Sequence, residues 1–244
     1  MEKKYQTVEY FRDSRGVRLG ESTATIFYGQ CGEDLEIYVD FISKDLEFFK
    51  DTGTYIEIGA SDGVKYSNSK FFEDELGFSG ILIEPLPNFF DTLKQTRPNN
   101  RLYNCAVSEE GDSVDVFYSS RIDGYRSGMT KTMASAQKKE AGFNDSEDII
   151  SVPAKKMSDI MNESKLERID IFSIDVEGGE YEVLATIDWN IPIYLFIIEL
   201  AVGEEETQKD INCRNLMKDK GYHFHKRVGI SEIWYDPFYF EKVK

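Results

Sequence analysis

Short apolar segments alternate with helical patterns along most of this chain, and this alternation constrains the fold more than any other feature. Two of the segments, 171–175 and 193–200, are apolar on both faces of a strand. Strands of that kind belong to a mainly parallel sheet with helices on both sides, whereas half-exposed strands alternate apolar and polar residues. The chain is therefore expected to fold as a doubly wound α/β domain.

The other elements follow from the same pattern. Strands are expected at 55–59, 80–84 and 102–107, and helices at 33–49, 67–76, 87–95, 179–187 and 206–220. The last two apolar runs, 222–227 and 232–235, are separated by too few residues for a crossover. They are expected to form an antiparallel hairpin at one edge of the sheet.

The length of 244 residues and the hydrophobic content of 41% suit one large domain with a real core. We expect an N-terminal arm and helical cap over 1–50 and a ligand-binding domain over 51–244. The segment 119–150 interrupts the strand and helix rhythm with Gly, Ser, Lys and Asp. An insertion after a strand of such a sheet can lie over the ligand crevice, on the substrate side, but a solvated surface loop is an equal alternative.

The charge of the chain limits its partners and its compartment. A formal net charge of −16 repels phosphate backbones and anionic lipid, so nucleic acid and membrane surfaces are not expected partners. The longest apolar run, 193–198, is far shorter than the roughly 20 residues of a membrane span. The three cysteines form no C-x-x-C pair, and no apolar secretion signal opens the chain. We therefore expect a cytoplasmic protein.

The strongest motif is YIEIGASDG at 55–63, a strand that ends in a glycine turn. Gly59 lets the backbone turn beneath a ligand, and Gly63 relieves crowding. The glycines that a dinucleotide fingerprint needs are missing at Ser61 and Val64. Glu57, just before the turn, suits a ligand with an ammonium and a sulfonium better than a pyrophosphate, and S-adenosylmethionine is such a ligand. A tight turn without a ligand is the alternative.

Two further strand ends fit the same ligand. Glu84, followed by Pro85, lies 25 residues beyond Gly59, close to the spacing of roughly 20 at which an acid binds ribose hydroxyls. A carboxylate can accept both hydroxyl protons. The alternative is a charge that favours a helix N-terminus. Ala106 and Val107 end the next predicted strand with small side chains, which leaves room for a flat base.

A fourth motif places acids at the ends of two central strands: Asp175, Glu177 and Glu180 follow one, and Glu199 ends the next. Such ends face the ligand crevice, so these acids are expected at the reacting centre. We expect Asp175, Glu199 and Glu177 as catalytic residues, with Asp175 as a general base or orienting acceptor. Alternatively, Asp175 and Glu199 share a divalent cation such as Mg²⁺ or Mn²⁺. A third reading leaves the acids as helix caps.

Together these motifs resemble the FkbM-type S-adenosylmethionine-dependent methyltransferases. The matching segments are QCGEDL at 30–35, YIEIGASDG at 55–63, Ser67-Asn68, GFSGILIEPLPNFF at 77–90, Arg97-Pro98, CAVSEEGD at 105–112 and FSIDVEGGEYEVL at 172–184. They occur in order from about residue 28 to residue 200. The insertion at 119–150 and the C-terminal segment match poorly, so the acceptor substrate is left open.

The resemblance implies a class I methyltransferase fold, a Rossmann-like sheet of seven mainly parallel strands with a C-terminal antiparallel hairpin and an N-terminal helical cap. It also implies that Glu57, Gly59 and Asp62 hold the methionine end of the cofactor, Glu84 the ribose and 105–108 the adenine. The full set of expected cofactor contacts is Glu57, Gly59, Ala60, Asp62, Asn68, Glu84, Pro85, Ala106, Val107 and Asp175.

The activity implied by the resemblance is O-methylation, of a sugar hydroxyl in a glycan or glycoconjugate precursor. One alternative is a non-catalytic methyltransferase-like binding or adaptor module. Another is a nicotinamide-dependent oxidoreductase, although the chain lacks the glycine pattern of that class. By position along the chain, the candidate acceptor contacts are Tyr125, Arg126, Lys131 and Trp234. The oligomeric state is left open.

Overall fold

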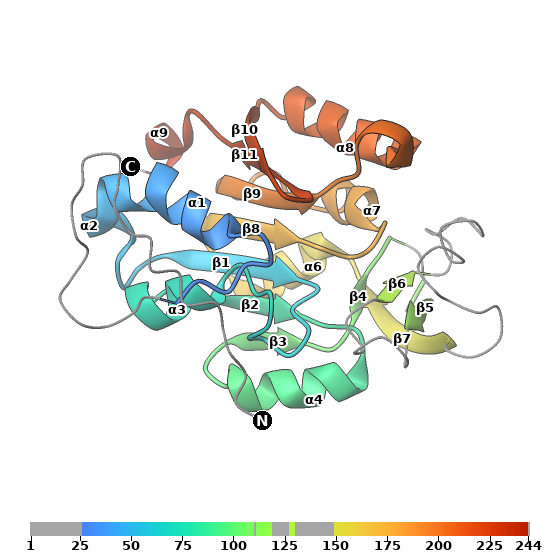
Figure 1. The fold of residues 1–244 in the computed structure, drawn as a ribbon. Helices are drawn as coiled ribbons and strands as arrows, with labels where there is room; N and C mark the ends of the chain where they lie inside the picture. Colours follow the sequence, from blue (N-terminus) through green and yellow to red (C-terminus); the bar gives the residue numbers. More distant parts are fainter. Residues whose placement is uncertain (1–25, 110, 119–126, 130–148, 244) are drawn as a thin grey trace.

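Seven strands form the main sheet of the computed structural model, which describes residues 26–109, 111–118, 127–129 and 149–243 (Figure 1). The strands are β1 (Thr54–Ile58), β2 (Ser79–Ile83), β3 (Arg101–Tyr103), β8 (Ile169–Ile174), β9 (Ile193–Glu199), β10 (His223–Val228) and β11 (Ser231–Tyr235). Their order across the sheet is β10-β11-β9-β8-β1-β2-β3. The first strand of the chain thus lies inside the sheet, as doubly wound folds require.

Strand directions confirm the mainly parallel sheet. Strand β1 pairs in parallel with β2 and β8, β2 with β3, and β8 with β9. Strand β11 runs antiparallel to β9, and β10 antiparallel to β11. The predicted C-terminal hairpin at the sheet edge is therefore confirmed. At its turn, a Cβ on Gly229 would lie 2.2 Å from the Cys31 Sγ, so the hairpin packs directly on the N-terminal segment.

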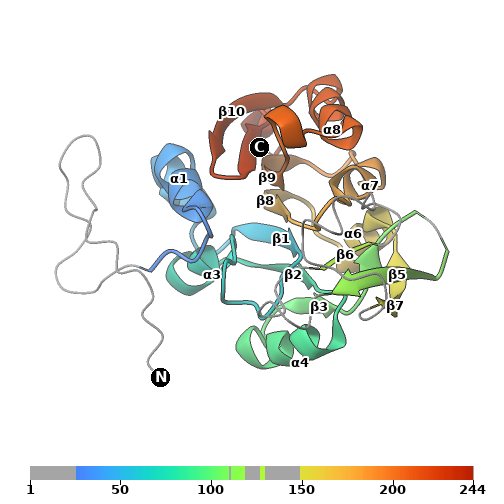
Figure 2. The ribbon, with the colours of Figure 1, turned by 45° about the vertical axis from the view of Figure 1, so that its right-hand side comes forward.

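Helices cover both faces of the sheet (Figure 2). One face carries α1 (Glu33–Asp40), α2 (Leu46–Phe49), α3 (Lys70–Leu76), α4 (Pro87–Thr96) and α9 (Tyr239–Lys242); the other carries α6 (Met157–Ser164), α7 (Glu180–Ala185) and α8 (Gln208–Asp219). Side chains alternate along β1, so Tyr55 packs with the first group and Ile56 with the second. Both are fully buried.

The predicted helix over 33–49 is wrong as one element. Helix α1 ends at Asp40, Phe41 leaves helical geometry, and a 3₁₀ turn over Ile42–Asp45 leads into α2. The break lets two aromatic side chains reach the same partner, because Phe41 and Phe49 each place their ring centroid 5.9 Å from that of Tyr194. The helix expected from residue 67 begins only at Lys70.

The predicted strand over 102–107 is also wrong as one element. Strand β3 ends at Tyr103, and β4 (Ala106–Val107) joins a second sheet of order β4-β7-β5-β6 with β5 (Ser113–Tyr118), β6 (Ser127–Met129) and β7 (Ile149–Lys155). Between them, Asn104 Nδ2 donates to the carbonyls of Glu84 and Pro85 at 2.8 and 3.0 Å. This contact turns the chain away from the main sheet. The second sheet and α6 were not predicted.

The N-terminal segment that the structure describes lies along the sheet from the hairpin to the loop after β1. On α1, Asp40 accepts hydrogen bonds from His225 Nε2 at 2.8 Å and pairs with Lys226 Nζ at 2.7 Å. Gly29 forms an isolated parallel bridge with Tyr66. The helical part of the predicted cap is confirmed from Glu33 onward, and residues 1–25 lie outside the described part. Among the described residues, none of the helices is both long and apolar enough to cross a membrane.

Candidate cofactor and active site

Backbone hydrogen bonds join the carboxyl ends of the three central strands. The N–H groups of Gly59 and Ala60 donate to the Ile83 carbonyl at 3.0 and 3.1 Å, and the Asp175 N–H donates to the Ile58 carbonyl at 3.2 Å. The turns after β1, β2 and β8 are therefore held at one edge. Ligands of open α/β sheets bind at this edge.

Gly59 sits where the turns after β1 and β8 touch. Its φ of 81° is a left-handed conformation, and a Cβ built on it would lie 1.9 Å from the Asp175 carbonyl oxygen. Conformation and space thus both require glycine. Gly63 has a φ of 78°, and a Cβ there would lie 2.5 Å from Leu93 Cδ1 on α4. The tight turn predicted from these two glycines is present.

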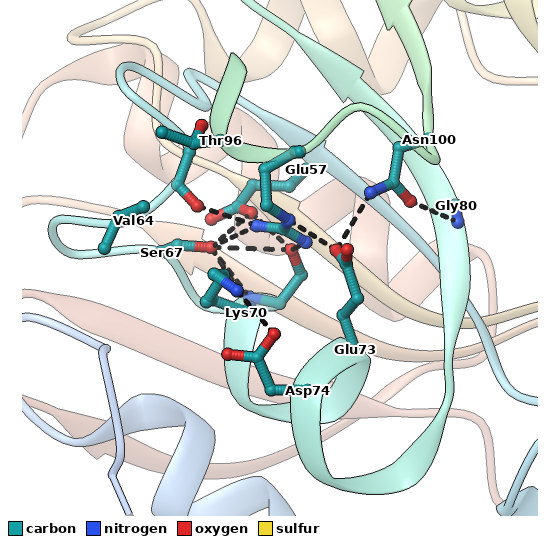
Figure 3. Close-up of polar contacts among 12 residues, drawn as sticks. Glu57, Val64, Ser67, Lys70, Glu73, Asp74, Gly80, Thr96 and Asn100 are labelled. Carbon is teal, nitrogen blue, oxygen red and sulfur yellow. Dashed lines mark hydrogen bonds and ion pairs between the residues drawn. The ribbon is translucent and has the colours of Figure 1, made fainter. Parts of the chain in front are cut away.

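The Glu57 carboxylate is buried and bonded to the loop at 67–69 (Figure 3). Its Oε2 accepts hydrogen bonds from Ser67 Oγ at 2.8 Å and Ser69 Oγ at 2.5 Å, and its Oε1 accepts one from the Asn68 N–H at 2.7 Å. These bonds also explain why α3 does not begin at residue 67. Contact of Glu57 with the methionine end stays a prediction.

Asn68 and Asp62 shape the same loop. Asn68 is buried, and its Nδ2 donates to Ser173 Oγ on β8 at 3.0 Å. Asp62 Oδ1 accepts from the N–H groups of Val64 and Lys65 at 2.9 and 2.8 Å. Both side chains thus connect the glycine turn to its surroundings, and their cofactor contacts stay predictions.

Glu84 links the turns after β1 and β2. Its side chain is buried, its Oε2 accepts from the Ser61 N–H at 2.8 Å, and its Oε1 accepts from the Leu86 N–H at 2.9 Å. Burial raises the pKa of Glu84 to about 7. Each carboxylate oxygen can accept a further hydrogen bond, so this group suits a pair of ribose hydroxyls.

The segment predicted to meet the adenine starts the second sheet. Ala106 is buried beside Leu86, and Val107 is buried in the core on the face of the main sheet that carries α6, α7 and α8. Asn104 ties the segment to the backbone of Glu84 and Pro85. Ala106 and Val107, which come after Glu84 in the sequence, are therefore also held close to Glu84 in the structure.

Asp175 and Glu199 meet at the ends of adjacent strands. Their carboxyl groups hydrogen-bond to each other. Burial raises the pKa of both groups, and the Asp175 charge raises that of Glu199 further. The two carboxyl groups therefore hold each other at this edge of the sheet.

Glu180 shapes the turn between Asp175 and α7. Its Oε1 accepts from the N–H groups of Gly178 and Val176 at 3.0 and 3.3 Å, and burial raises its pKa to about 7. Glu177, in the same turn, is half-buried with a φ of 53°. Its catalytic role stays a prediction. No group of three or more His, Cys, Asp or Glu side chains in the described ranges could hold a metal ion.

Of the four residues expected to contact the acceptor, the structure describes only Trp234. Tyr125, Arg126 and Lys131 lie outside the described residues. Trp234 is 2% exposed within the main core, and its indole N–H donates to Glu232 Oε2 at 3.1 Å. Its prediction as an acceptor contact is wrong, because its ring packs into the core instead of an open crevice.

The acids of the QCGEDL motif were not predicted to be buried. Glu33 is 2% exposed and its Oε1 accepts from Ser231 Oγ at 3.1 Å, next to the Glu199 end of β9. Asp34 Oδ2 accepts from the Tyr28 N–H at 2.6 Å, and burial raises the pKa of Asp34 to about 6. The two acids fix the N-terminal segment at the carboxyl edge.

A second group that sequence reasoning missed surrounds Arg97, which is fully buried. Tyr55, Glu73 and Asn100 belong to it: Asn100 Nδ2 donates to Glu73 Oε2 at 2.9 Å, and Asn100 Oδ1 accepts from the Gly80 N–H at 3.1 Å (Figure 3). The only signal was the Arg97-Pro98 pair within the matching motifs. An arginine at a helix end is usually exposed, so the sequence did not predict its burial.

Comparison with protein families matches residues 57–224 to the family described as "Methyltransferase FkbM domain". This range is more than half of the chain. Among curated proteins, "Methyltransferase 1" from Beauveria bassiana (strain ARSEF 2860) is 25% identical over 229 residues, which covers 79% of this chain and 88% of that protein.

Solved structures are also similar to this chain, among them the following two. A TehB-like SAM-dependent methyltransferase from Corynebacterium glutamicum is 10% identical with a TM-score of 0.42, covering 84% of this chain and 87% of that chain. Aeropyrum pernix fibrillarin, solved with natively bound S-adenosyl-L-methionine, is 10% identical with a TM-score of 0.45, covering 85% of this chain and 74% of that chain.

Proposed function

This chain belongs to the FkbM methyltransferase domain family, and on that premise we propose that it methylates a sugar hydroxyl of a glycan or glycoconjugate precursor. It is an S-adenosylmethionine-dependent methyltransferase with a class I fold. The observation that supports an oxygen acceptor is the hydrogen-bonded pair of Asp175 and Glu199, beside the Gly59 turn.

The residues at the sheet edge fit this cofactor. The space that a Cβ of Gly59 would fill is already occupied by the Asp175 carbonyl, so the backbone forms a close turn for the methionine end. Glu84 keeps acceptor capacity for ribose hydroxyls. When bound, S-adenosylmethionine supplies an electrophilic methyl group on a sulfonium. The surrounding acids favour that positive charge.

We assign Asp175 the role of proton acceptor. The hydrogen bond between Glu199 and Asp175 fixes the orientation of the Asp175 carboxyl group and leaves it lone pairs for a hydroxyl. Asp175 would accept the proton of that hydroxyl when its oxygen is methylated, and the bond between the methyl group and the sulfonium sulfur would break to leave a neutral thioether. Holding the hydroxyl in line contributes on the order of 7–11 kcal/mol, so positioning is the larger effect.

In the described part of the chain, three cations near the ends of β8 and β9 support a neutral acceptor. Lys209 pairs with Glu182, Arg214 with Glu206, and Arg227 Nη1 donates to the Ile230 carbonyl. Lys209, Arg214 and Arg227 also donate to the backbone carbonyls of Gly178, Ala201 and Leu200, respectively. These three side chains are engaged within the protein. An acceptor with neutral hydroxyls matches this edge better than a phosphate or a carboxylate does.

The direct test offers the purified protein S-adenosylmethionine with a deuterated methyl group and a panel of sugars, phenols and amines. We expect S-adenosylhomocysteine to form with a sugar, and NMR of the product to place the label on oxygen. Label on nitrogen alone would contradict the hydroxyl acceptor. Cofactor binding without turnover on any acceptor would favour the non-catalytic module.

A chelator separates the two roles considered for the acid pair. Because the two carboxyl groups bond to each other, we expect turnover to persist in excess EDTA. The measurement is the initial rate with and without EDTA, and after adding Mg²⁺ or Mn²⁺. A rate abolished by EDTA and restored by either ion would assign Asp175 and Glu199 to a shared cation instead.

A further inference from the structure

Arg97 follows α4 and uses every donor of its buried guanidinium on the polypeptide around the cofactor turn. The five N–H groups reach the Gly63 carbonyl at 2.9 Å, Ser67 Oγ at 3.2 Å, Ser69 Oγ at 3.0 Å, Tyr55 Oη at 2.7 Å and the Glu73 carboxylate. An arginine has five N–H donors, so none remains unpaired. A charge buried in this way is fixed in place.

Two serine hydroxyls connect Arg97 to Glu57. A guanidinium only donates, so Ser67 and Ser69 accept from Arg97 and are free to donate their own protons. Both donate to Glu57 Oε2, at 2.8 and 2.5 Å. The positive and negative charges are thus joined through the loop at 67–69, and the backbone of that loop is held from both sides (Figure 3).

The end of α4 also holds the turn that precedes this loop. Thr96 Oγ1 donates to the Asp62 carbonyl at 2.6 Å, and the next carbonyl, of Gly63, accepts from Arg97. A Cβ on Gly63 would lie 2.7 Å from Arg97 Cγ, so turn and side chain are in direct contact. The segment from Asp62 to Ser69 is therefore shaped by Thr96 and Arg97, which lie 28 to 34 positions after their partners in the chain.

We propose that Arg97 is a positioning residue for S-adenosylmethionine: with Glu57, it holds the segment at 62–69 in the conformation that binds the cofactor, without touching the cofactor itself. The proposal rests on the proposed cofactor site at the Gly59 turn. It assigns Glu57 a role exerted through Ser67 and Ser69, in addition to any direct contact. It also gives the Arg97-Pro98 motif a function.

Lysine does not replace arginine in this arrangement. An ammonium has three donors around one point, whereas the guanidinium of Arg97 spans β1, the glycine turn, the loop and α3 at once. Arg97→Lys keeps the charge but leaves acceptors unpaired. Ser69→Ala is milder, because it removes one bridging hydroxyl and keeps both charges.

The experiment measures two quantities for each variant: the Kd for S-adenosylhomocysteine by calorimetry, and the free energy of unfolding by urea titration. Tyr239→Phe is the matched control. Its hydroxyl is buried and bonds to Asp170, near the start of β8 and so at the opposite edge of the sheet. This control loses a buried hydrogen bond that does not reach the segment at 62–69.

We expect Arg97→Lys and Ser69→Ala to raise the Kd by about tenfold or more, and Tyr239→Phe to leave it unchanged while lowering stability. A Kd within about twofold of the native value in both variants would overturn the positioning role. If Arg97→Lys does not fold, Ser69→Ala decides. If the native protein itself fails to bind S-adenosylhomocysteine, the cofactor assignment fails instead.

Discussion

Among single residues, Glu84 carries the clearest expectation for cofactor binding. Replacing Glu84 with alanine removes the acceptor for ribose hydroxyls, so we expect a Kd for S-adenosylhomocysteine at least about tenfold higher, corresponding to about 1.4 kcal/mol. Glu75→Ala, at an exposed glutamate on α3, is the control and is expected to leave the Kd unchanged. Equal affinity of Glu84→Ala and the native protein would remove the ribose assignment.

The pH dependence of binding tests the same carboxyl group. Hydroxyl donors favour its ionised form, so binding lowers the Glu84 pKa from its value of about 7 in the free protein. Affinity is then highest above pH 7 and falls as the pH drops from 7 toward 5. Calorimetry across this range should show the fall in the native protein and a weaker one in Glu84→Ala. Identical pH profiles would contradict the role of Glu84.

Asp175 is expected to affect turnover more than binding. Asp175→Asn keeps the size of the side chain but removes the proton acceptor, so we expect kcat to fall about 10²- to 10⁴-fold. The Kd for S-adenosylhomocysteine should change by no more than about threefold. Steady-state kinetics on the best acceptor and calorimetry measure the two. An equal loss of both would indicate damage to the turn instead of loss of a base.

The sequence located these residues but not their partners. Strand periodicity was enough to place Asp175 and Glu199 at adjacent strand ends, because both follow strongly apolar runs. It could not show that the two carboxyl groups bond to each other and have raised pKa values, since this depends on burial in three dimensions. Nor could it show that Glu57 bonds to Ser67 and Ser69, because hydroxyl contacts leave no periodic signal.

For the elements, the turn after β1 gives the sharpest prediction. In Gly59→Ala, the alanine must adopt a left-handed φ and its Cβ clashes with the Asp175 carbonyl oxygen. We therefore expect a loss of about 3 kcal/mol in the free energy of unfolding. Gly221→Ala has a similar φ of 86° but open space around its Cβ, and should cost only about 1 kcal/mol. Urea titration of both variants measures the difference, and equal losses would rule out the close contact.

Element boundaries were predictable where one pattern dominated. Helix α4 begins at Pro87 as expected, because proline suits the first turn of a helix. Helix α1 ended early because tertiary contacts of Phe41 outweighed the helical spacing. The break between β3 and β4 depended on Asn104, whose side chain bonds to a neighbouring strand end that is distant in sequence. No local pattern contains such a contact.

For the whole molecule, the buried acids set how stability depends on pH. Burial raises the pKa of Asp34 to about 6 and those of Glu84 and Glu180 to about 7, above their values in an unfolded chain. The folded state therefore binds more protons, and stability falls as the pH rises from about 5 through 7. Urea titrations between pH 5 and 8 should show this fall. Stability that increases over this range would contradict it.

The overall architecture was predictable because several independent signals agreed. Apolar strands, intervening helices and the short connection of the hairpin all favour one doubly wound sheet, and the order β10-β11-β9-β8-β1-β2-β3 agrees with them. The second sheet was not predictable, because its longer strands, β5 and β7, pair with each other across the poorly patterned segment 119–150.

The negative charge of the protein also affects the release of S-adenosylhomocysteine, the product formed from the methyl donor. Methyl transfer removes the sulfonium charge, so the product retains its ammonium and carboxylate but loses its net positive charge. Attraction by the overall charge of −16 then weakens. The acidic protein therefore attracts S-adenosylmethionine more strongly than S-adenosylhomocysteine, and this difference grows at low ionic strength because charges are screened less. We expect inhibition by S-adenosylhomocysteine to weaken as ionic strength falls.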